Sequence, residues 1–141
     1  MRTVLTTCAV LLLLATMPAR ASVAGRWLTA DGDGWVQISL DTGAPVGRIA
    51  GSPNEQPERF DELNPDPELR SRSLLDLVIL EGFEPDGDGK WKGGTIYDPN
   101  TGKTYKCKMK LVDENTLEVR GYIGFALVGR TETWTRVVSD N

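Results

Sequence analysis

The chain has 141 residues, of which 40% are hydrophobic, and its 16 basic and 20 acidic residues give a net charge of −4 at neutral pH. This length suits a single domain, and the acidic balance argues against nucleic-acid partners and anionic membranes. The sequence has no histidine, which excludes His-dependent catalytic triads and removes the usual general base and a common zinc ligand.

Residues 1–21 have the pattern of a signal peptide. Arg2 gives a positive start, a short apolar stretch runs up to Leu14, and Ala19-Arg20-Ala21 fits a small-x-small cleavage site. We expect cleavage between Ala21 and Ser22, so that the mature domain is 22–141 and is periplasmic or secreted. The chain would then meet the membrane only transiently, through its signal peptide.

The mature chain would keep one of the two cysteines, Cys107. It alternates with Tyr105, Met109 and Leu111, whereas its direct neighbours are lysines. This pattern predicts a buried, unreactive thiol on the core face of a strand. We expect no internal disulfide, no metal and no cofactor.

The rest of the chain reads as short strands that alternate apolar and polar residues between turns. Eight strands are predicted, at 25–29, 35–40, 45–50, 75–83, 91–97, 103–112, 116–123 and 130–138. Turn sequences rich in Gly, Asp and Asn separate most of them. The predicted fold is all-β, a small antiparallel up-and-down β-barrel of about eight strands.

The segment 51–72 departs from this pattern. It is mostly polar and contains Pro53, Pro57, Pro65 and Pro67, and proline cannot donate to a sheet ladder. We expect a long Pro-rich loop with one helical turn starting at Asp66. A loop of this length allows the strands on either side of it to lie far apart in the sheet.

Several motifs together resemble the small exported bacterial proteins grouped as "domain of unknown function 2147". The resemblance covers most of the mature chain. It rests on Gly25-Arg26-Trp27, Asn64-Pro65-Asp66-Pro67, Trp91-Lys92-Gly93-Gly94, Tyr97-Asp98-Pro99, Gly102-Lys103-Thr104-Tyr105, Arg120-Gly121-Tyr122-Ile123-Gly124, Gly129-Arg130-Thr131 and Trp134. It implies a calycin, that is, a lipocalin-like barrel, and no established reaction.

Lipocalins also carry a Gly-x-Trp motif on the first strand and a late Arg that lies against the Trp. By this resemblance Gly25, Trp27 and Arg136 would fill those places, with Trp134 as a further structural residue. Many members of the family have extra cysteines in the first half of the chain. None lies there in the mature chain, so no disulfide or metal role carries over.

The connection from Gly121 to Gly129 is the best candidate for a binding site, because it is apolar, uncharged and placed at one end of the predicted barrel. Two interpretations remain open. The connection either lines a portal for an apolar ligand or folds inward and plugs the barrel, which short strands favour. The candidate ligand-binding residues are Tyr122, Phe125, Leu127 and Arg130.

The sequence shows no catalytic motif, and we predict that the protein is not an enzyme. Asp-Gly-Asp-Gly occurs at 31–34 and 86–89, but hairpin turns explain both without calcium. Two classes of function remain. One is a periplasmic module that binds a small apolar or amphipathic molecule; the other is a filled barrel that acts on an envelope protein partner through its Pro-rich loop.

Overall fold

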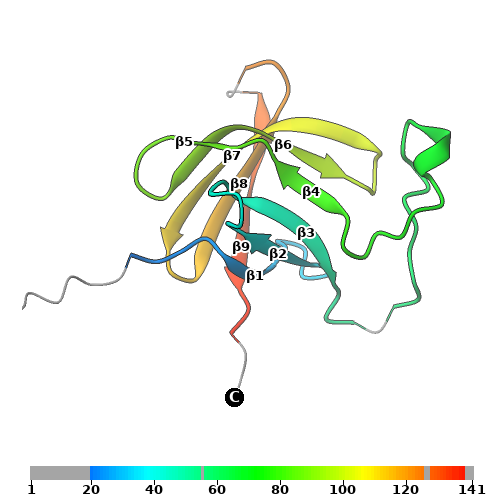
Figure 1. Ribbon diagram of the computed structural model, residues 1–141, viewed down its shortest axis with the longest axis horizontal. Helices are drawn as coiled ribbons and strands as arrows, with labels where there is room; N and C mark the ends of the chain where they lie inside the picture. The colour runs from blue at the N-terminus through cyan, green and yellow to red at the C-terminus, as the bar shows by residue number, and fades with distance from the viewer. Residues whose placement is uncertain (1–19, 55, 126–127, 139–141) are drawn as a thin grey trace, which may run out of the picture.

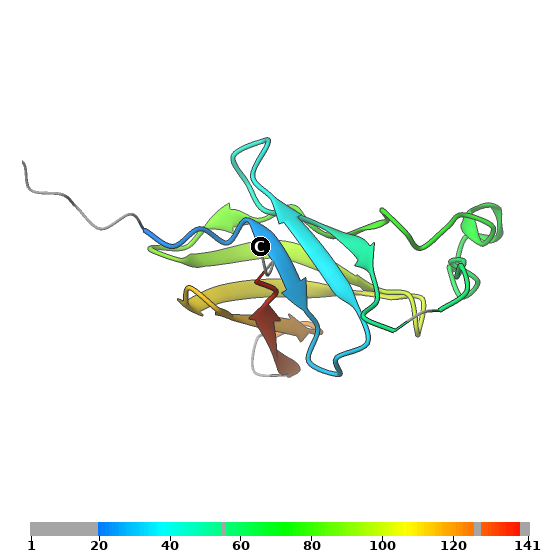
Figure 2. The same cartoon turned by 90° about the horizontal axis from the view of Figure 1, so that it is seen from below.

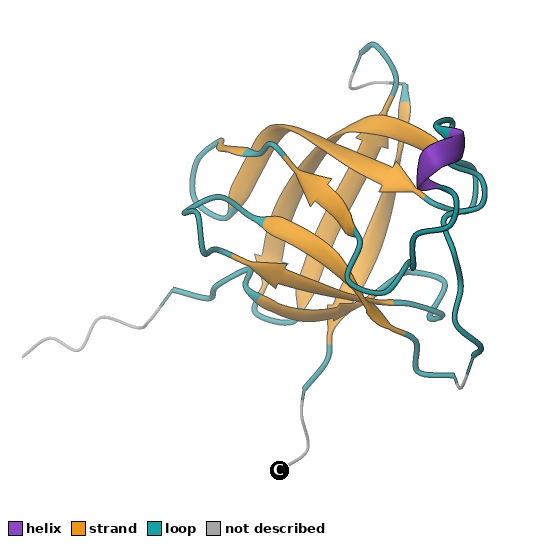
Figure 3. Ribbon diagram, turned by 45° about the vertical axis from the view of Figure 1, so that its right-hand side comes forward, coloured by secondary structure: helices purple, strands orange, loops and turns teal. Residues whose placement is uncertain are grey.

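The strands of the protein close into an antiparallel barrel. The computed structural model describes residues 20–54, 56–125 and 128–138 (Figure 1). Neighbouring strands follow chain order, β1 pairs with β9, and β4 pairs with β6, which closes a ring of eight strands (Figure 3). The short β5 pairs with the start of β6 outside this ring. This architecture confirms the predicted up-and-down barrel.

The described residues contain nine strands and one 3₁₀ turn. They are β1 (Gly25–Leu28), β2 (Trp35–Ser39), β3 (Val46–Gly51), η1 (Pro67–Leu69), β4 (Val78–Glu81), β5 (Glu84–Pro85), β6 (Lys90–Asp98), β7 (Lys103–Asp113), β8 (Thr116–Tyr122) and β9 (Gly129–Arg136). In the part of the chain that the structure describes, no helix is long and apolar enough to cross a membrane.

The fourth predicted strand is shorter than expected. Asp76 has a left-handed backbone with φ 66, and Gly82 has φ 78, so β4 is confined between them. Moreover, β3 and β4 are direct neighbours, paired at Gly47 with Leu80. The long loop between them therefore does not separate them in the sheet. The Gly93-Gly94 pair interrupts the ladder between β6 and β7 with a shift of register.

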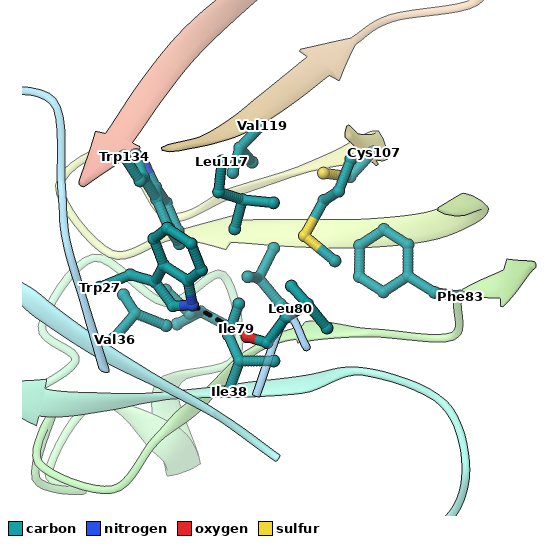
Figure 4. Close-up of a cluster of buried hydrophobic side chains, with 12 residues drawn as sticks. Trp27, Val36, Ile38, Ile79, Leu80, Phe83, Cys107, Leu117, Val119 and Trp134 are labelled. Carbon is teal, nitrogen blue, oxygen red and sulfur yellow. Dashed lines mark hydrogen bonds between the residues drawn. The ribbon is translucent and has the colours of Figure 1, made fainter. Parts of the chain in front are cut away.

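The interior of the barrel is solidly packed at the end where the chain enters β1. Two indole side chains, of Trp27 and Trp134, lie on one side of this cluster and Phe83 lies on the other (Figure 4). Its members are Val23, Trp27, Val36, Ile38, Ile79, Leu80, Phe83, Cys107, Met109, Leu117, Val119 and Trp134. Cys107 is fully buried, and burial raises the pKa of its thiol to about 12, so the thiol is unreactive as predicted.

Arg136 closes this packed end. Its guanidinium lies over the Trp27 ring at 4.3 Å from the centroid, which is the contact expected from the sequence. The same guanidinium donates hydrogen bonds to the carbonyls of Ser22, Ala24 and Glu114. Its position requires Gly25, because a Cβ there would lie 2.5 Å from Arg136 Nη1. The Gly-x-Trp motif therefore has a steric reason.

Replacing Trp27 with alanine should remove the largest part of this packing. Trp27 is fully buried, and its indole nitrogen donates to the Val23 carbonyl at 2.9 Å. The cavity left behind should cost about 3–5 kcal/mol of the free energy of unfolding. Urea titration measures this loss. Val112→Ala, at a side chain that is 47% exposed, is the control and should change stability by less than about 0.5 kcal/mol. A loss below about 1 kcal/mol for Trp27→Ala would contradict the assignment.

Candidate functional site

The other end of the barrel holds a cavity of about 1380 Å³. The connections β1–β2, β3–β4, β6–β7 and β8–β9 lie at this end, and each contributes residues to its lining. In Figure 2 the long β3–β4 connection extends beyond the strands on one side of the barrel. The cavity thus opens at the end opposite the Trp27–Arg136 contact.

The wall of the cavity is formed largely by apolar side chains from strands on all sides of the ring. They include Ile49 on β3, Ile79 on β4, Ile96 on β6, Tyr105 on β7 and Val119 on β8. The register places Ile96 opposite Tyr105, and alternation along each strand turns these positions to one face. An apolar wall with a few polar groups is typical of small-molecule sites.

Gly121 keeps part of this space open. A Cβ at this position would lie 3.5 Å from Ile96 Cγ2 and 3.6 Å from Tyr105 Cβ, which is ordinary contact distance. The backbone therefore does not demand glycine here. By contrast, Gly129 on the next strand is required, because a Cβ there would lie 2.4 Å from the carbonyl oxygen of Gly121. The absence of a side chain at Gly121 leaves room above Tyr105 and Ile96.

Two of the predicted ligand-binding residues line the cavity and one does not. Tyr122 and Arg130 are part of the lining, together with Ile123 and Val128. Phe125 is 81% exposed and is not part of the lining, so the structure does not bring it to the cavity as predicted. It lies in the connection between β8 and β9, where its carbonyl accepts a hydrogen bond from the Val128 N–H. Leu127 lies outside the described residues.

The described residues of this connection do not form the inward plug that the sequence also allows. Ile123 is 68% exposed and Val128 is 62% exposed, so these side chains border the opening and do not fill the interior. Short strands alone do not decide how far a barrel is filled. The closed end is filled by Trp27, Trp134 and the residues packed around them, whereas the cavity lies between the strands and loops of the open end.

A buried polar cluster that the sequence does not reveal fixes the Pro-rich loop. Asp61 is fully buried and accepts hydrogen bonds from the Tyr97 hydroxyl, from Asn64 Nδ2 at 2.8 Å and from Arg72 Nε at 2.9 Å. Arg72 also forms an ion pair with it at 2.8 Å. In the sequence Asp61 looks like the neighbouring acidic residues Glu58 and Glu62, so no local signal distinguishes it.

This cluster sets the position of the loop beside the cavity mouth. The Asp61 N–H donates to the Arg72 carbonyl, and Phe60 forms a β-bridge with Ser73, so the segment between them is closed on itself. Gly102 in the β6–β7 turn contacts the backbone of Leu63, and a Cβ on Gly102 would overlap the Leu63 carbonyl oxygen. The loop is therefore held against the outside of β6, and its two ends border the mouth.

The cluster also shifts two pKa values. Burial raises the pKa of Asp61, but hydrogen bonds from Tyr97, Asn64 and Arg72 outweigh it and hold the pKa below its usual value. Burial and the adjacent Asp61 carboxylate together raise the pKa of Tyr97 to about 12. Asp61 is thus a charged anchor near neutral pH.

Two more carboxyl groups, of Asp31 and Asp33, meet at the rim of the cavity. A side-chain hydrogen bond between them lowers the pKa of Asp31 and raises that of Asp33, and burial adds to the rise for Asp33. Among residues 20–54, 56–125 and 128–138, no group of three or more His, Cys, Asp or Glu residues is arranged to hold a metal ion.

Comparison with known proteins supports the assignment of the barrel. Residues 25–136 match the family described as "Uncharacterized protein conserved in bacteria (DUF2147)". The chain belongs to this family. A similar solved structure is protein HP1028 from the human pathogen Helicobacter pylori, described as belonging to the lipocalin family. It shares 25% identity with a TM-score of 0.79, and the match covers 84% of each chain. A search of curated proteins gave no match.

Asp61→Asn should loosen the anchor of the loop and change how stability depends on pH. Because the folded-state pKa of Asp61 is lowered, its contribution is present above the unfolded value near 3.9 and is lost as pH falls through the folded value. We expect a loss of about 1–3 kcal/mol at pH 7, and a smaller difference from the wild type at pH 3.

Urea titrations at both pH values measure this effect. Glu62→Gln is the matched control, since Glu62 is an exposed acidic residue next to Asp61, and it should change stability little at either pH. Equal stability of Asp61→Asn and wild type at pH 7 would show that the cluster does not hold the loop.

Proposed function

We propose that this protein is an exported, non-enzymatic binding protein that holds a small apolar or amphipathic molecule inside its barrel. The observation that carries the proposal is the cavity of about 1380 Å³, with its apolar wall and its opening between the loops of one end. The lipocalin family assignment of HP1028 is consistent with a barrel of this kind. A filled barrel that acts only through its outer surface would not need this space.

The expected binding mechanism is burial of apolar surface. Each Å² removed from water contributes about 25 cal/mol, so a ligand that buries about 300 Å² gains roughly 7 kcal/mol before the cost of association is subtracted. Before that cost, the gain corresponds to a dissociation constant of about 10 μM, and the cost of association weakens the binding toward the millimolar range. Tyr122 and Arg130 at the opening are available for polar contacts.

Export is the second part of the proposal, and the start of the barrel supports it. Val23 is buried in the core, and the Ser22 carbonyl accepts a hydrogen bond from Arg136. Both residues lie after the expected cleavage position between Ala21 and Ser22. A cut at this point would leave every contact of Arg136 and Trp27 in place.

Gly121→Phe should block the cavity. A Cβ at this position is at ordinary van der Waals distance from Ile96 and Tyr105, so a side chain can be added without straining the backbone. The phenyl ring would then occupy the cavity. We expect the affinity for the neutral fluorescent probe N-phenyl-1-naphthylamine to fall at least about tenfold, the change that corresponds to a loss of about 1.4 kcal/mol.

Two control variants accompany this test. Thr133→Phe places the same ring on the exposed outer face of β9 and should leave probe binding unchanged. Gly121→Ala adds only a methyl group and should keep both the fold and most of the binding. If Gly121→Phe folds, as circular dichroism would show, and still binds the probe like the wild type, the ligand site is not this cavity.

Processing of the N-terminus is tested separately. Protein recovered from the periplasm or medium of a bacterium that expresses the full chain should begin at Ser22 by N-terminal sequencing. The intact chain should accumulate when Ala21→Asp disrupts the cleavage site. Two results would contradict export by a cleaved signal. One is an Ala21→Asp protein that still begins at Ser22, and the other is an exported wild-type chain that begins at Met1.

A further inference from the structure

Glu132 lies low in the binding cavity, next to the packed end of the barrel. It is part of the cavity lining and pairs across the ladder with the buried Val119. On β9 it stands between Trp134, which belongs to the packed core, and Arg130, which lies nearer the opening. A carboxylate therefore lies on the part of the strand wall that also holds Val119 and borders the packed core.

The neighbours of this carboxylate hold it weakly. Trp134 Nε1 donates to Glu132 Oε2 at 3.3 Å, which is long for a hydrogen bond. Arg130 Nε is 3.9 Å from Glu132 Oε1, and the Arg130 side chain is 85% exposed. An ion pair of this length between partly solvated groups contributes little. The Glu132 carboxylate thus keeps acceptor capacity that faces the cavity.

The charges around the cavity as a whole sum to a negative value. Its lining contains five carboxylates and two guanidinium groups, a net charge of −3. The carboxylates belong to Asp31, Asp33, Glu58, Asp98 and Glu132, and the guanidinium groups belong to Arg59 and Arg130. Of the two cations, Arg59 donates a hydrogen bond to Asn100 at 3.0 Å. A cavity lined in this way repels an anionic head group and attracts a cationic one.

The aromatic lining agrees with this preference. Tyr105 and Tyr122 belong to the cavity wall, and aromatic faces attract ammonium groups that are removed from water. From these observations we infer that the cavity selects cationic amphiphiles, with one amine or ammonium group at Glu132 and an apolar chain or ring system along Ile49, Ile79 and Ile96. This inference rests on the proposed function and specifies the ligand class of the same site.

The test compares three ligands with the same ten-carbon chain. Decylamine, 1-decanol and decanoate, each below its micelle-forming concentration, displace N-phenyl-1-naphthylamine from the full-length protein at pH 7. We expect decylamine to bind at least about tenfold more tightly than decanoate, since a charge-assisted hydrogen bond in a partly dry site is about twice as strong as a neutral one. Decanol should lie between them.

Glu132→Gln assigns the preference to one residue. It keeps the shape of the side chain and removes the charge, so the difference between decylamine and decanoate should shrink to less than about threefold. Glu118→Gln is the matched control, because Glu118 lies on β8 opposite Thr133 on the outer face. This variant should keep the wild-type preference.

The remaining outcomes would contradict the charge preference, the role of Glu132 or the binding function itself. If decanoate binds the wild type as tightly as decylamine, the inference about charge is wrong and the binding function stands. If the preference for decylamine survives in Glu132→Gln, the rim carboxylates provide it and the assignment to Glu132 is wrong. If neither the dye nor any of the three compounds binds, the proposed function itself fails.

Discussion

The contact between Arg136 and Trp27 organises the closed end of the barrel. One guanidinium stacks on a buried indole and, through three carbonyls, joins the segment before β1, the β7–β8 turn and the end of β9. A cation on an aromatic face contributes about 0.5–2 kcal/mol, more when water is excluded. Because the first and last strands meet here, this contact fixes the closure of the barrel as well as its core.

Closure at one end decides where a ligand can go. The packed core gathers around Trp27 and Trp134, and the opposite half of the barrel holds the cavity, with Gly121 leaving space on the wall. The strand β9 runs from the open end to the closed end. Its inward positions pass from Arg136 at the closed end through Trp134 and Glu132 to Arg130 near the opening. The same strand thus carries the structural contact and the candidate specificity residue.

The Pro-rich loop borders the mouth with little regular secondary structure, namely η1 and the bridge between Phe60 and Ser73. A single buried carboxylate, Asp61, ties it to Tyr97 on β6 and to Arg72 at its far end. Burying a charge is costly unless it is paired and hydrogen-bonded, and here three donors satisfy it. This arrangement explains how a mostly polar segment keeps a defined position beside a cavity, with Gly102 allowing the close approach of the chain at Leu63.

The sequence alone determined the strands and the barrel, because period-two alternation and turn residues are local signals. Alternation also indicated the buried Cys107, and the resemblance to lipocalins implied the contact of Trp27 with Arg136. Only the tertiary structure decided the rest. Phe125 is exposed in the β8–β9 connection, Asp61 is buried, and Glu132 lines the cavity because ring closure brings β9 beside β1. These positions depend on contacts between strands and loops that are distant in the sequence, and a local pattern of residues does not predict such contacts.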